Sequence, residues 1–227
     1  MSVVLPAFSS EVRQGRDLKR PYLAAVSIVT VFHWPALLLL SVLAYPVVDI
    51  VLGSQWSEAA PLVQVVAIAL LFSFSFELNY PVMVAMGAIR DLFIRALIVF
   101  PLSGILLSAA VVFGGLQAAA WCLLVTVPFQ AYVALSFVRR RLGLRRREIA
   151  AALWKSAVIA LATAAAPLAA MFVSGSGFDL SFGQAIAAGP LALGGWATAL
   201  ILTRHPLLDE IIKTFPALRR DRLHPAE

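Results

Sequence analysis

The side chain with the clearest chemical potential is Glu77, an acid inside a long apolar stretch. A carboxylate in hydrocarbon costs at least about 2.5 to 3.5 kcal/mol on insertion scales, so such acids tend to face a cavity or a partner. Glu77 lies roughly 14 Å from the end of the stretch at Met86, close to the middle of a bilayer. Ser73 and Tyr80 share its helical face, whereas Asn79 lies on a different face. The pattern predicts a polar lining for an aqueous path. The alternative is a carboxyl group kept neutral by burial, or hydrogen-bonded to a neighbouring helix for packing alone.

A histidine in an earlier apolar stretch has a similar expected depth. His33 and Glu77 could pair or relay protons, and the alternative is a histidine satisfied by structural hydrogen bonds. Pro81 has no N–H, so the carbonyl of Glu77 should lack its helical donor. Gln130 and Thr163 are weaker candidates, because uncharged polar groups commonly join membrane helices. The residues expected along a transport path are Ser73, Glu77, Asn79, Tyr80 and His33.

Two arginines form a second candidate group. Arg90 precedes the next apolar stretch, and Arg95 lies one turn inside it. The long side chain of Arg95 can snorkel to the membrane interface, paired with Asp91 at i, i+4 spacing. Anchoring at the interface is the prediction for both arginines, and binding of a phosphorylated lipid headgroup is the alternative.

Signatures of catalysis and of metal binding do not occur in the sequence. It contains no G-x-x-x-x-G-K-[ST] loop, no H-E-x-x-H helix and no G-x-S-x-G elbow. Cys122 is the single cysteine, so the chain can form neither an internal disulfide nor a cysteine-based metal cluster. We expect no cofactor and no enzymatic activity.

Composition places these side chains in a membrane protein. The chain has 227 residues, of which 61% are hydrophobic and 13% charged, and its mean hydropathy is +0.91. These values exclude a water-soluble fold. The apolar runs are long and continuous, which favours membrane-spanning helices over the alternating strands of a barrel. The predicted fold is an all-α polytopic bundle of about six spans. The spans are residues 22–45, 60–86, 92–113, 116–138, 151–173 and 183–203.

Basic residues indicate how these spans are oriented. The 18 lysines and arginines exceed the 12 acids and give a formal net charge of +6. With six spans all 18 fall on one side, and the opposite connections contain none. This positive-inside pattern predicts cytoplasmic termini and explains the basicity without nucleic acid. The expected organisation is a basic cytoplasmic segment at 1–21, a six-helix transmembrane domain at 22–203 and a basic cytoplasmic tail at 204–227.

Three segments resemble bacterial polysaccharide exporters and flippases, a branch of the multidrug/oligosaccharidyl-lipid/polysaccharide exporter superfamily. They read LPAFSSEVRQGRDLKRPY at 5–22, AYPVVDIVLGSQWSEAAPLVQ at 44–64 and MVAMGAIRDLF at 83–93. The likeness covers essentially the whole chain and is weakest after Arg147. It implies two lobes of helices around a central cavity with alternating access. Such a cavity moves a lipid-linked oligosaccharide from the inner to the outer leaflet of the bacterial cytoplasmic membrane.

The resemblance also implies that the chain is the carboxy-terminal part of such a transporter. Alternating access needs two elements that rock against each other around a shared site, so we expect the chain alone to be unable to flip its substrate. The expected partners are lipid-linked oligosaccharide, membrane lipid, and a missing amino-terminal half or polysaccharide synthesis proteins. Two alternatives stay open. One is a multidrug or lipid-precursor exporter of the same superfamily, and the other is a non-transporting subunit that scaffolds a polysaccharide assembly complex.

Overall fold

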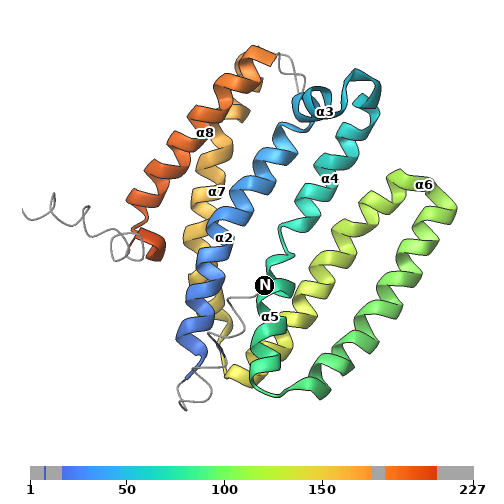
Figure 1. Cartoon of the computed structure of the whole chain (residues 1–227), viewed down its shortest axis with the longest axis vertical. Coiled ribbons are helices and arrows are strands. Elements are labelled where there is room, and N and C mark those ends of the chain that lie inside the picture. The colour runs from blue at the N-terminus through green and yellow to red at the C-terminus, as the bar shows by residue number, and fades with distance from the viewer. Residues whose placement is uncertain (1–7, 9–16, 175–181, 209–227) are drawn as a thin grey trace, which may run out of the picture.

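The structure is a computed structural model that describes Phe8, residues 17–174 and residues 182–208. Every regular element in these ranges is helical, which confirms the predicted all-α membrane bundle (Figure 1). Within the described ranges, four segments are long and apolar enough to cross a membrane, and residues 186–202 form a shorter apolar helix. The elements are α2 (Lys19–Val42), α3 (Ala44–Leu52), the 3-10 helix η1 (Ser54–Ala59), α4 (Ala60–Leu70), α5 (Phe74–Ala85), α6 (Ile89–Leu142), α7 (Arg146–Ser174) and α8 (Phe182–Leu202).

Helix α6 contains two of the predicted spans, joined by a sharp reversal. Its arms, residues 89–114 and 116–142, run side by side in Figure 1, and a hydrogen bond from Gln130 to Ser103 links them. At the reversal Gly115 has φ 66° and ψ −158°, a conformation that is essentially restricted to glycine. The two predicted spans, residues 92–113 and 116–138, therefore fall on the two arms of α6.

The second predicted span, residues 60–86, is not one continuous helix. Helix α4 ends at Leu70 and α5 begins at Phe74. The backbone between them is tightened, with i to i−3 hydrogen bonds such as Ser73 N–H to Leu70 O at 2.9 Å. Pro81, which has no N–H to donate to the Glu77 carbonyl, lies inside α5. Ser73, predicted to share a helical face with Glu77 and Tyr80, is the N-cap of α5 and has helical φ and ψ.

Packing is closest where α2 crosses the bundle. Helix α2 lies between α7 and α4, α8 covers α7, and α4 and α5 pack against α6 (Figure 1). A core of buried side chains such as Tyr22, Val26, Phe74, Met83 and Val138 joins α2, α5 and the end of α6. Large apolar side chains cover the outer surface as well, especially on α6. Such a surface is suited to contact with lipid chains, because apolar groups lose nothing by exposure there.

The described cationic residues gather at one end of the bundle, at the starts of α2, α6 and α7 and the ends of α6 and α8 (Figure 1). Two contacts connect these helix ends. Arg141 forms an ion pair with Asp91, and the Lys155 ammonium donates to the carbonyl of Arg204 at 2.8 Å. The i, i+4 spacing predicted a pair between Asp91 and Arg95, but Asp91 pairs with Arg141. The reason is that the reversal in α6 brings the end of this helix back to its start. The compartment that this end faces stays a prediction.

Candidate functional site

The break between α4 and α5 is a tightened turn that two aromatic side chains of α2 contact. His33 Nε2 lies 3.0 Å from the carbonyl oxygen of Leu70, and Trp34 Nε1 donates to the carbonyl of Leu71 at 2.7 Å. A carbonyl only accepts hydrogen bonds, so Nε2 of His33 carries the proton in this geometry. In a membrane interior each carbonyl released from a helix needs a donor from elsewhere. Trp34 supplies such a donor to the Leu71 carbonyl. The Leu70 carbonyl already accepts the Ser73 N–H, so His33 adds a second hydrogen bond there, and both side chains fix α2 against the turn between α4 and α5.

Ser73 joins this arrangement, whereas Glu77 does not. The Ser73 hydroxyl lies 3.1 Å from His33 Nε2, so two of the residues predicted from the sequence lie together at the break. Glu77 is exposed on α5 and forms no ion pair or hydrogen bond with a described residue, His33 included. Tyr80, one turn further along α5, is 52% exposed. His33 therefore makes structural hydrogen bonds, and the acid is left on an open face.

Asn79 lies on the opposite, enclosed side of α5, as the helical spacing predicted. Its side chain is completely buried, and its Oδ1 accepts a hydrogen bond of 2.6 Å from the hydroxyl of Tyr22 on α2. The amide nitrogen Nδ2 has no partner among the described residues. The pair fixes α5 against α2 directly behind the face that carries Glu77 and Tyr80.

Tyr22→Phe should destabilise the fold by about 1 to 2 kcal/mol, because the buried Asn79 would then lose its hydrogen-bond donor as well. Tyr132→Phe is the matched control, since Tyr132 is 63% exposed. The free energy of unfolding in mixed micelles measures both effects. Equal stability of the Tyr22→Phe variant and the wild type would show that the hydrogen bond contributes nothing.

A second buried polar cluster, which was not predicted from the sequence, joins α2, α7 and the segment after α8. His205, which follows α8 and is 1% exposed, accepts the Leu207 backbone N–H at Nδ1 at 3.2 Å. Its Nε2 therefore carries the proton, and it lies 2.9 Å from the Ser27 hydroxyl of α2. Nearby, Thr30 donates to the Ser156 hydroxyl of α7 at 2.8 Å. The i, i+3 pair of hydroxyls in α2 was a signal for a polar contact, but its partners lie more than 100 residues away in the sequence.

The remaining candidates occupy separate places. Arg95 lines a cavity of about 190 Å³ with Gln130 and apolar or aromatic side chains of α5 and α6, whereas Arg90 is exposed at the basic end. Gln130 bonds Ser103 across the two arms of α6 at 3.0 Å, and Thr163 bonds the Ile159 carbonyl of its own helix at 2.7 Å. Both therefore support packing. Among the described residues no group of three or more metal-ligating side chains comes together.

The bundle and its broken span define a polytopic helical membrane protein. A family model described as a polysaccharide biosynthesis protein matches residues 1–61. This match includes α2 with His33 and Trp34, and it ends before the break and Glu77. No curated protein and no solved structure matches the chain. Over its first 61 residues the chain is thus similar to polysaccharide biosynthesis proteins.

Proposed function

We propose that this bundle is part of a transporter that flips or exports lipid-linked oligosaccharide or polysaccharide across the bacterial cytoplasmic membrane. The family match over residues 1–61 supports the connection to polysaccharides. The observation that carries the proposal is the broken span, followed by an exposed acid in the same apolar stretch. We assign the bundle a role in binding and movement of the substrate, with no bond made or cleaved.

Broken helices in membranes have a restricted distribution. Irregular backbone at membrane depth is tolerated where protein buries it or where it lines a water-filled cavity. In many secondary transporters such breaks lie near the bilayer midplane, beside the substrate or the coupling ion. Leu71 lies 11 residues after the start of α4 at Ala60, so the break is roughly 16 Å along the span. It therefore has the depth expected of a transport site.

The exposed face of α5 supplies groups that such a site needs. Glu77 cannot face hydrocarbon as a carboxylate without a cost of about 2.5 to 3.5 kcal/mol or more. In the membrane this face must therefore meet water or a polar surface of another protein segment. Tyr80 offers a ring and a hydroxyl on the same face, which suits contact with a sugar. Glu77 would bind a coupling ion or a sugar hydroxyl, and His33 and Ser73 would hold the break behind it.

Glu77→Gln tests the proposal in cells that depend on this protein for export. The substitution keeps the shape and removes the charge, so we expect at least about a tenfold loss of export, since a group that acts in the transport step is removed. Surface polysaccharide is measured against an immunoblot of the protein. Glu58→Gln is the control, because Glu58 is an exposed acid in η1 outside the broken span.

Normal export at a normal protein level in the Glu77→Gln variant would reduce Glu77 to a packing residue. Deletion of the gene separates the other functions. A strain that still exports polysaccharide but loses association among its synthesis proteins would favour a scaffold. A strain that loses efflux of drugs or of a lipid precursor, with intact polysaccharide, would indicate another exporter of the same superfamily.

A further inference from the structure

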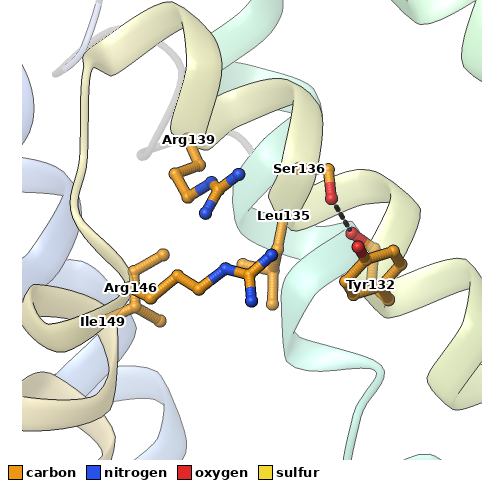
Figure 2. A pocket seen from close by; sticks show the side chains of 6 residues that line it. All are labelled: Tyr132, Leu135, Ser136, Arg139, Arg146 and Ile149. Atoms are coloured by element: carbon orange, nitrogen blue, oxygen red, sulfur yellow. Dashed lines mark hydrogen bonds between the residues drawn. The ribbon is translucent and has the colours of Figure 1, made fainter.

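A shallow pocket opens at the basic end of the bundle, where the chain passes from α6 into α7. Its volume is about 220 Å³. Figure 2 shows the side chains of Arg139, from the end of α6, and Arg146, from the start of α7, reaching toward the same space. The complete lining is Tyr132, Leu135, Ser136, Arg139, Arg146 and Ile149.

The local backbone brings the two arginines together. Four lining residues lie on α6 with the i, i+3, i+4, i+7 spacing of a single helical face. Helix α6 ends at Leu142 and is capped by Gly143, which is left-handed with φ 62°. The Leu144 N–H returns to the Arg139 carbonyl at 3.0 Å. Only three residues separate α6 from α7. This tight connection places the first turn of α7 beside the last turns of α6.

Among the described residues, no acid pairs with the two arginines of the pocket. Neither Arg139 nor Arg146 forms an ion pair or a hydrogen bond with a described residue. Of the nearby acids, Asp91 pairs with Arg141, and the Glu148 carboxylate bonds the backbone N–H of Arg145 at 2.6 Å and not a guanidinium of the pocket. Two guanidinium groups with like charge therefore converge on one space, and a bound anion would relieve their mutual repulsion.

The rest of the pocket is apolar and extends toward the membrane. Leu135 and Ile149 form its wall, and Tyr132 lies seven residues before Arg139 on the same face of α6. At helical rise this places Tyr132 about 10 Å deeper along the helix than Arg139. A ligand that follows this face has a charged end at the arginines and an apolar end among aliphatic and aromatic side chains.

We propose that this pocket binds the phosphate of an anionic membrane lipid, with the headgroup between Arg139 and Arg146 and an acyl chain along the α6 face. Guanidinium groups bind phosphate oxygens in a bidentate manner. Basic pockets between membrane helices are suited to anionic headgroups. The Ser136 hydroxyl, which donates to the Tyr132 carbonyl at 2.7 Å, can accept a further hydrogen bond from a headgroup hydroxyl. This site is independent of Glu77 and of transport.

Binding of phosphatidylglycerol to the purified full chain in a neutral detergent tests the proposal by native mass spectrometry. The variant Arg139→Gln/Arg146→Gln is compared with Arg140→Gln/Arg147→Gln, which removes the same charge from the same two helix ends but spares the pocket lining. We expect the wild type to prefer phosphatidylglycerol over phosphatidylcholine by about tenfold, and the first variant to lose this preference. The control variant should stay within about twofold of the wild type. Melting temperatures without lipid show that both variants are folded.

Other outcomes would overturn the proposal. Equal loss of binding in the two double variants would indicate a diffuse basic surface without a pocket. Unchanged binding in Arg139→Gln/Arg146→Gln would exclude the pocket directly. Displacement of phosphatidylglycerol by millimolar inorganic phosphate would assign the arginine pair to a free anion instead of a lipid. If Arg139→Gln/Arg146→Gln does not fold, Tyr132→Glu places a negative charge on the acyl path and must weaken phosphatidylglycerol binding for the proposal to stand.

Discussion

Trp34→Ala is expected to lower the free energy of unfolding by about 3 to 5 kcal/mol, the range for removal of a large packed aromatic side chain. Trp34 packs against the core of α2, α5 and α6 and meets Phe74 edge to face, with ring centroids 5.9 Å apart. It also donates to the Leu71 carbonyl at the break. Its removal therefore opens a cavity and leaves a backbone acceptor without a donor at the same place.

Trp34→Phe separates these two contributions. The ring contact with Phe74 is largely kept while the indole N–H is lost, so the expected cost is about 1 to 3 kcal/mol, the penalty for one buried group without its partner. Trp154→Phe is the control, because Trp154 is 65% exposed on α7. Reversible unfolding in mixed micelles gives the free energies. If the free energy of unfolding falls no more in Trp34→Phe than in Trp154→Phe, the Leu71 carbonyl needs no donor. The account of the break would then fail.

Acid is expected to destabilise the wild type through His205. Burial lowers the pKa of His205 from its ordinary value of 6.5 to about 4, and the nearby Lys155 ammonium acts in the same direction. The unfolded chain therefore binds a proton near pH 6.5, whereas the folded chain stays neutral until about pH 4. Full stability is present above pH 6.5 and is lost as the pH falls toward 4. Between pH 7 and 4.5 this one group should cost about 2.5 kcal/mol.

The variant His205→Gln isolates this effect from the carboxylates that titrate in the same range. Glutamine can still donate to Ser27 but binds no proton, so its stability should fall less between pH 7 and 4.5. The difference between wild type and variant at each pH gives the histidine contribution. Parallel stability curves for the two proteins would show that His205 has an ordinary pKa in the folded state.

Helix lengths and the general architecture could be predicted from the sequence because both follow from local chemistry. A run of about 20 apolar residues requires a membrane helix, and its backbone bonds are satisfied within the run. The reversal lies at Gly114 and Gly115, between two such runs. Lysines and arginines could be assigned to one end of the bundle because each of them is costly inside hydrocarbon. This cost does not depend on how the helices pack against one another.

The candidate site was predicted less completely. Glu77 and Tyr80 were found because polar residues in an apolar run are conspicuous, and the structure shows both of them exposed. The break at residues 71–73 could not be found, because neither proline nor glycine occurs there. Pro81, whose missing N–H was expected to leave the Glu77 carbonyl without its helical donor, lies in the interior of α5. The side chains that bond the carbonyls of this turn, His33 and Trp34, come from α2, about 37 residues earlier in the chain. Helical periodicity carries no information about contacts between two helices.

The sequence by itself determined that this protein is a helical membrane bundle with a basic end, since hydrophobicity and charge act on each segment separately. Only the tertiary structure decided that the partner of His33 is a backbone carbonyl and not the Glu77 side chain. It also decided that Asp91 pairs with Arg141 and that Arg139 and Arg146 share one pocket. Each of these contacts joins different helices or opposite ends of a folded-back helix. Their formation depends on rotation and proximity, which are set when side chains pack and buried polar groups find partners.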